Sequence, residues 1–225
     1  MRCDGSVNTR EHIIAERAEL VDLLRSLTPE QWAAPSLCQG WSVRDVVGHL
    51  SIDAVPMHRY LLAGLRNPSV ARLNRHYVEA ARDVPADRLV DGLATSVSGS
   101  WFLRFFPQLT LADHVVHQQD IRRPLGLPRV VDAERLRMVL DHPDPFARPS
   151  RHIRGLRLVA TDMAWERGDG PVVRGTGEAL ALAMVGRDAV LDELDGAGVH
   201  ELRSRIGRAG AAPTAPGSGR DPESC

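Results

Sequence analysis

Apolar residues recur at three- and four-residue steps along the first part of the chain, a pattern typical of amphipathic helices. The segments with this pattern run from Arg10 to Leu27, Val43 to Leu65, Val70 to Ser98 and Gln108 to Leu125. Ser42 is a suitable N-cap for the second segment, in which Pro56 is expected to introduce a kink. Pro85 interrupts the third segment. Four helices with short connections predict an antiparallel bundle.

The pattern changes after Leu127. The segment around residues 156–160 is typical of a strand, with Leu156, Leu158 and Ala160 on one face, and a GDGP turn precedes a second short strand at 171–175. Further short helices are expected at 177–186, 188–194 and 199–206, which together predict a small α/β unit. The chain is therefore expected to be of the α+β class, with domains at residues 9–127 and 128–206. The segment 207–225 is rich in Gly, Pro, Ser and Ala and is expected to be a disordered tail.

Composition narrows the function classes. Hydrophobic residues form 43% of the 225 residues, which is enough for a substantial core. The net charge of −1 and the lack of a basic stripe argue against a nucleic-acid partner and a membrane partner. Since the N-terminus lacks the apolar stretch of a secretory signal, a cytoplasmic protein is expected. The cysteines Cys3, Cys38 and Cys225 form no disulfide framework, and reduced thiols are expected, with Cys38 buried and structural rather than reactive.

Two polar residues of the fourth helical segment suggest a metal site. Asp113 and His117 lie four residues apart, so a helix places both side chains on one face. Such a pair is a preorganised half-site for a divalent cation. His49 is the best third ligand, because it lies within the apolar run VVGHL, where a buried imidazole needs a partner. Two histidines and one carboxylate leave a coordination position open, as in catalytic zinc sites.

Alternative interpretations remain at this point. Asp113 and His117 can form a surface ion pair, and His49 can be a core histidine satisfied by its neighbours. His114 is a competing ligand, although it points about 100° away from Asp113 around a helix. Asp120, one turn after His117, and Asp53, one turn after His49, either support a ligand from behind or pair with an arginine.

Three stretches, SLCQGWSVRDVVGHL, DHVVHQQDIRRPLG and GLRLVATDMAWERGDGPVVRGTGEALALAMVGR, occur in this order. Together they resemble the mycothiol-dependent maleylpyruvate isomerase family over residues 10–206. The resemblance implies an N-terminal DinB-like metal-binding four-helix bundle and a small C-terminal domain. It also implies a divalent metal, usually zinc, and the thiol cofactor mycothiol.

The resemblance assigns the metal ligands to His49, Asp113 and His117. The family usually has Glu where this chain has Asp113, and the aspartate reaches one carbon less far. The site is therefore expected to be tighter or weaker than in relatives, or to recruit His114.

The resemblance implies an enzyme that acts on a small-molecule substrate with a low-molecular-weight thiol, as an isomerase or an S-transferase. A substrate with carboxylates would need arginines, and those nearest to the ligands in sequence are Arg59, Arg104, Arg122 and Arg123, each of which is more simply a solvated surface residue. The alternative function is a non-catalytic metal-binding or regulatory protein with the same fold, which the substitution at Asp113 makes credible.

Overall fold

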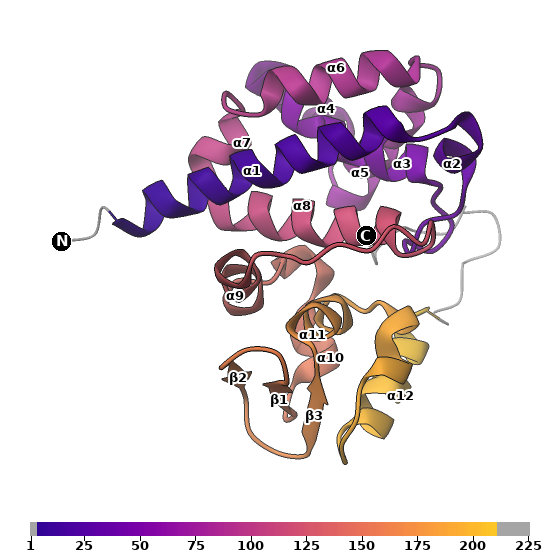
Figure 1. Ribbon diagram of the computed structural model, residues 1–225. Coiled ribbons are helices and arrows are strands. Elements are labelled where there is room, and N and C mark those ends of the chain that lie inside the picture. Colours follow the sequence, from indigo (N-terminus) through magenta and orange to yellow (C-terminus); the bar gives the residue numbers. More distant parts are fainter. Residues whose placement is uncertain (1–3, 211–225) are drawn as a thin grey trace. The chain divides into compact units, whose positions relative to one another are not determined.

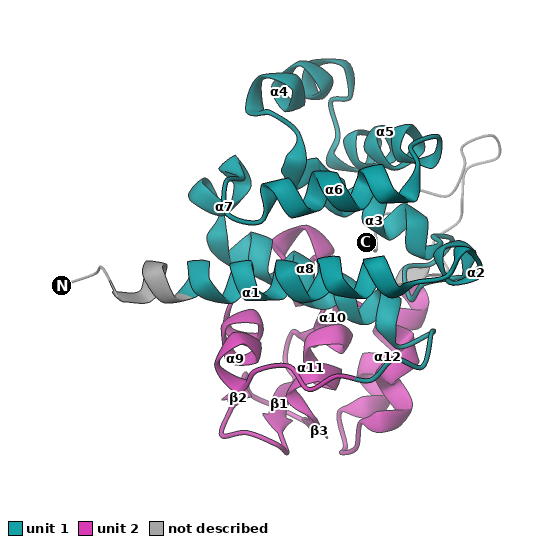
Figure 2. Ribbon diagram, turned by 45° about the horizontal axis from the view of Figure 1, so that its top comes forward, with its two compact units in different colours: residues 1–128 teal, residues 129–225 magenta. Residues whose placement is uncertain are grey.

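A computed structural model describes residues 4–210 of the chain (Figure 1). The chain divides into two compact units, Met1–Pro128 and Arg129–Cys225, which Figure 2 shows in different colours. Unit 1 is helical, and unit 2 combines helices with a three-stranded sheet. The predicted α+β class is confirmed.

Unit 1 is built from helices that pack around one apolar core. They are α1 (Asp4–Ser26), α2 (Pro29–Ala33), α3 (Val43–Leu50), the 3-10 helix η1 (Ser51–Ala54), α4 (Met57–Arg66), α5 (Val70–Arg82), α6 (Ala86–Ser96), α7 (Trp101–Phe105) and α8 (Pro107–Arg122). Helix α1 packs against α6 and α8, while α3 packs against α5 and α8. Helix α8 therefore packs against both α1, which carries Arg17, and α3, which carries His49.

The predicted helix from Val43 to Leu65 is wrong in one respect. Pro56 does not kink a continuous helix: α3 ends at Leu50, η1 follows, and α4 begins only at Met57. Val55, the residue before the proline, has the extended conformation that proline imposes on its predecessor (φ −77°, ψ 127°). Helix α4 is thereby freed to leave the direction of α3.

Unit 2 contains α9 (Ala133–Asp141), η2 (Pro145–Ala147), α10 (Pro149–Ile153), α11 (Gly177–Met184), η3 (Asp188–Glu193) and α12 (Val199–Gly210). Its strands are β1 (Arg157–Ala160), β2 (Glu166–Arg167) and β3 (Val172–Gly175), in the order β2-β1-β3. Strand β1 pairs antiparallel with β2 and parallel with β3, where Leu158 lies opposite Val173. Both of these residues are buried and contribute to the core of the unit.

Two expectations concern the ends of the chain. The predicted tail begins at residue 207, but α12 continues to Gly210, and the rest of the tail lies outside the described residues. Cys38 is buried, as expected, whereas Cys3 and Cys225 lie outside the described residues. No helix within residues 4–210 has the length and apolar content needed to cross a bilayer.

Candidate metal centre

Helix α3 carries His49 into the interior of unit 1. Ser42 caps this helix by accepting a hydrogen bond from the backbone of Asp45, whose carboxylate accepts one from the backbone of Ser42 in return. At Gly48 an added Cβ would lie only 2.7 Å from the Cβ of Ala81, so the glycine allows α3 and α5 to approach closely. The position of His49 is therefore fixed by both a helix cap and a close helix contact.

Helix α8 supplies Asp113 and His117 one turn apart, as their spacing predicts. Oδ1 of Asp113 lies 3.2 Å from Nε2 of His117 and 3.4 Å from Nε2 of His49. The three ligand atoms lie within 4.8 Å of one another. The structure thus brings together all three residues that the sequence analysis selected. The shorter side chain of Asp113 reaches both imidazoles.

A carboxylate behind His117 orients its ring. Nδ1 of His117 lies 2.8 Å from Oδ2 of Asp120, which is fully buried. The backbone carbonyl of Asp120 accepts a hydrogen bond of 3.0 Å from the amide of Leu37, so the loop before α3 is tied to the end of α8. With Nδ1 donating to Asp120, Nε2 faces Asp113. Of the two interpretations of Asp120, support of a ligand from behind agrees with this contact.

A second group of potential ligands shares His117. Cys38, His117 and Asp120 also have ligand atoms within 4.8 Å of one another, and Sγ of Cys38 lies 3.1 Å from Oδ2 of Asp120. This group uses Nδ1 of His117, which is already at hydrogen-bond distance from Asp120. The donor set of His49, Asp113 and His117 is therefore the better candidate.

A buried arginine lies behind the donor set. The Arg17 guanidinium forms an ion pair with Asp53, and its Nε donates to Nε2 of His114 over 3.3 Å. It also donates to the carbonyl of Ser96 over 2.8 Å. Nδ1 of His114 lies 2.9 Å from the carbonyl of Thr110, so both ring nitrogens of His114 are occupied. His114 therefore does not complete the donor set, and Asp53 pairs with an arginine.

The pKa values of His114 and His117 shift in opposite directions within this cluster. Burial, reinforced by the charge of Arg17, lowers the pKa of His114 to about 3, so its imidazole is neutral. Burial opposes protonation of His117 too, but the carboxylates of Asp113 and Asp120 raise its pKa to about 9. Burial raises the pKa of Asp53 to about 6, although Arg17 opposes the shift. For Asp113 the two neighbouring imidazoles outweigh burial and hold the pKa well below its usual range. The face of the cluster that holds Asp113 and His117 thus attracts positive charge.

Arg17 was missed by the sequence analysis, although a signal for it exists. It lies at the three- and four-residue steps of the apolar stripe formed by Ile13, Leu20 and Leu24 on α1, and it is buried with them. Two of the four arginines proposed as substrate clamps have other surroundings. Arg104 lies over the ring of Phe105, and Arg59 lines a separate pocket.

Comparison with known proteins agrees with the resemblance seen in the sequence. Residues 14–73 match the family model of the mycothiol maleylpyruvate isomerase N-terminal domain, a range that includes His49. A crystal structure of a mycothiol-dependent maleylpyruvate isomerase has a TM-score of 0.55 with this chain at 12% identity, covering 85% of this chain and 92% of the other. A histidine-to-alanine mutant of a mycothiol-dependent maleylpyruvate isomerase gives a TM-score of 0.54 with the same identity and coverage. Among curated proteins no sequence match is found. The family model supports the resemblance over residues 14–73, and the two structures show that the chain shares their fold.

Proposed function

We propose that this relative of the mycothiol-dependent maleylpyruvate isomerases is a cytoplasmic, divalent-metal enzyme that uses mycothiol to isomerise or transfer a small-molecule substrate. The metal ligands would be His49, Asp113 and His117. The observation that carries the proposal is the convergence of these three side chains from α3 and α8, with Oδ1 of Asp113 3.2 and 3.4 Å from the two Nε2 atoms.

The donor atoms fit a divalent cation better than they fit hydrogen bonds alone. Donor–acceptor distances of 3.2 and 3.4 Å are long for an N–H···O bond, which centres on about 2.9 Å. Tetrahedral zinc with bonds of about 2.0–2.1 Å places its donors about 3.3 Å apart. Two imidazoles and a carboxylate are also donors that zinc accepts. Zinc is therefore the expected ion.

The two histidines are supported unequally. His117 is oriented by Asp120, whereas Nδ1 of His49 is buried with no hydrogen-bond partner among the described residues. The ring of His49 instead contacts the rings of Trp41 and His117, with centroids 5.7 and 4.9 Å away. His49 is thus held mainly by packing, and it is the ligand whose removal tests the proposal most directly.

The donor set is accessible to a small molecule. The side chains of His49 and Asp113 are 12% and 24% exposed, whereas that of His117 is 3% exposed. A thiol can therefore approach from the side of His49 and Asp113 while the ring of His117 remains shielded from water. A bound divalent cation favours thiolate over thiol and so supplies a nucleophile at neutral pH. His49, Asp113 and His117 would hold that cation and leave one side open.

Metal analysis of the purified protein tests the proposal. We expect about one zinc-like ion per chain and its loss in His49→Ala. The matched control is His58→Ala, which removes an exposed histidine of α4 and should retain the ion. A His49→Ala protein with full metal content, or a folded wild-type protein that takes up no metal, would contradict the metal site.

Thiol dependence separates the enzyme from a non-catalytic metal protein. With cobalt in place of zinc, millimolar mycothiol should change the visible spectrum, because a sulfur ligand alters the ligand field. The same spectrum with and without the thiol would leave a metal-binding protein without the proposed thiol chemistry.

A further inference from the structure

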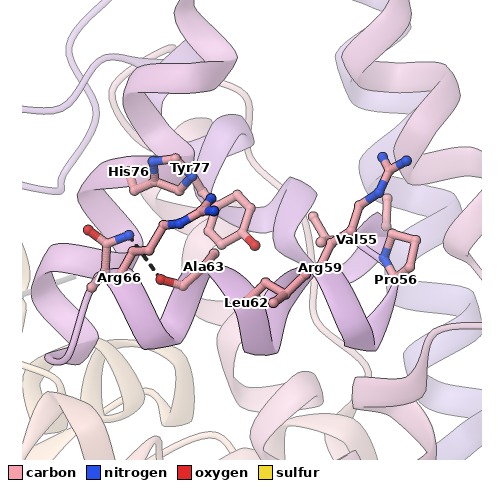
Figure 3. A pocket seen from close by; sticks show the side chains of 10 residues that line it. Val55, Pro56, Arg59, Leu62, Ala63, Arg66, His76 and Tyr77 are labelled. Carbon is pink, nitrogen blue, oxygen red and sulfur yellow. Dashed lines mark hydrogen bonds between the residues drawn. The ribbon is translucent and has the colours of Figure 1, made fainter.

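A second site lies between α4 and α5, apart from the candidate metal centre. It is a cavity of about 500 Å³, within the range of small-molecule pockets, and none of His49, Asp113 and His117 lines it. Val55, Leu62 and Ala63 form apolar walls. Figure 3 shows Arg59 and Arg66 rising from α4 on the side where His76 and Tyr77 of α5 lie. The cavity thus combines an apolar surface with a basic rim.

The charge around this cavity is one-sided. Residues 54–78 contain four arginines and no Asp or Glu, although the whole chain has a net charge of −1. Arg59 and Arg66 lie seven residues apart on α4, so their side chains leave the same face about 10 Å apart along the helix axis. Neither guanidinium has a hydrogen bond or an ion pair with any residue of the described part of the chain. Both are available to an anion.

One wall of the cavity is a stacked aromatic group. The rings of Tyr77 and Tyr60 are nearly parallel, at 7°, with centroids 6.2 Å apart. Tyr60 also meets the rings of Trp101 and Phe102 edge-on, each at 5.2 Å. Rings held on several sides form a firm apolar wall. Leu62, which also lines the cavity, is 54% exposed and offers apolar surface to a ligand.

We propose that the cavity between α4 and α5 binds an organic anion that carries an apolar tail. The anionic head, a carboxylate or a phosphate monoester, is held by Arg59 and Arg66, whose guanidinium groups suit either oxyanion. The tail, aliphatic or a single aromatic ring, lies against Leu62 and Tyr77. The site is independent of the metal centre, and its occupant need not be the substrate of the proposed enzyme.

Octanoate and octyl phosphate serve as probes, with octanol as the uncharged tail and acetate as the head alone. Titration calorimetry on the full-length protein should show octanoate or octyl phosphate binding at least about tenfold more tightly than octanol and acetate, because charge-assisted hydrogen bonds add to apolar burial. The comparison between the two charged probes identifies the preferred head. Equal affinity for octanol and both charged probes would overturn the proposal.

Variants separate the head site from the tail site. The double variant R59A/R66A should weaken binding of the charged probes by about tenfold or more and leave octanol unchanged. Leu62→Asn should weaken binding of octanol and of the charged probes alike. Arg88→Ala, which removes an exposed arginine from α6, is the matched control and should change neither. Because all four side chains are exposed, the fold should survive these changes.

An anionic membrane is the competing partner. Met57, Leu61 and Leu65 form an exposed apolar stripe on α4, and basic amphipathic helices bind such surfaces. Co-sedimentation with vesicles of phosphatidylglycerol, compared with phosphatidylcholine, distinguishes the two. Binding to the anionic vesicles without measurable binding of monomeric octanoate or octyl phosphate would overturn the small-molecule site.

Discussion

Helices α8 and α4 depart in opposite ways from the usual pattern of buried apolar and exposed polar side chains. In α8 a run of polar residues is buried, namely His114, His117, Gln118, Gln119 and Asp120. In α4 no residue is buried, and Met57, Leu61, Leu62 and Leu65 are exposed. Buried polar groups and exposed apolar groups are the two informative exceptions in a soluble protein. Each helix here carries one of the two candidate sites.

The buried polar side chains of α8 and the exposed apolar side chains of α4 differ in whether other residues contact them. The charges of the buried cluster on α8 have specific partners, because Arg17 holds Asp53 and His114 while Asp120 holds His117. Helix α4 stands away from α1 and α8 in Figure 2, and its large apolar side chains are exposed. Substitutions in the network of α8 should therefore affect stability and metal binding strongly. Substitutions on the outer face of α4 should affect ligand binding but hardly affect the fold.

The largest expected effect comes from Arg17→Met. The side chain of Arg17 is 2% exposed, and its loss leaves the carboxylate of Asp53 buried without its cation. Breaking a buried ion pair from one side costs about 3–5 kcal/mol. Urea unfolding of the metal-free protein should show a loss of this size.

Two variants sharpen the result for Arg17. Arg25→Met changes an exposed arginine of the same helix and should shift stability by less than about 0.5 kcal/mol. The double variant R17M/D53N should recover part of the loss, because it removes the unpaired charge. A loss below about 1 kcal/mol in Arg17→Met would show that the polar network of α8 does not depend on this arginine.

Asp120→Asn should have the next largest effect, on metal binding. The amide retains the shape of Asp120 but removes the charge that orients and polarises His117. Replacing such a partner of a ligand typically lowers metal affinity by about 10–100-fold. Competition with a chromophoric chelator measures the change, and Asp91→Asn, at an exposed position of α6, is the control. Unchanged affinity would reduce Asp120 to a packing role.

The sequence predicted the parts of this arrangement that depend on local spacing. Asp113 and His117 share a face because they lie four residues apart, and Ser42 caps α3 as predicted. The roles of His114 and Arg17 were not predictable in this way. Each depends on partners far away in sequence, since Arg17 meets Asp53, Ser96 and His114 only after α1, η1, α6 and α8 have packed.

The same limit explains the error at Pro56. Its local effect on Val55 was foreseeable, but the new direction of α4 depends on contacts that form beyond the proline. The aromatic contacts of Tyr60 with Tyr77 and Trp101 hold that direction, and they join residues from three separate helices. Helical periodicity alone predicted that α4 would be helical and could not indicate that its apolar face remains uncovered.

Asp45 on α3 lies outside the buried polar cluster of α8, and its contribution to stability can be compared with that of Arg17. Burial opposes ionisation of Asp45, but hydrogen bonds from Arg82 and Ser42 outweigh it and lower the pKa. Asp45→Asn should cost about 1 kcal/mol at neutral pH, much less than Arg17→Met. Because the folded-state pKa lies below the unfolded value of 3.8, this contribution is present above pH 3.8 and is lost as pH falls through the folded-state pKa.

Unfolding of Asp45→Asn and wild type from pH 7 to pH 3 checks the sign. The difference between them should be constant near neutrality and should shrink only at the acid end of the range. A difference that grows as the pH falls would contradict the lowered pKa.

The smallest effect is expected on the outer face of α4. Leu65 is 81% exposed, and Leu65→Gln should change the free energy of unfolding by less than about 0.5 kcal/mol. Thermal unfolding at two protein concentrations measures this, and Leu111→Gln, at a buried apolar position of α8, is the contrasting variant with a loss of several kcal/mol. A loss above about 1 kcal/mol in Leu65→Gln that grows with protein concentration would mean that a second copy covers this face in solution. The exposed apolar side chains of α4 would then be buried by a second copy of the chain, whereas the buried polar side chains of α8 find their partners within one chain.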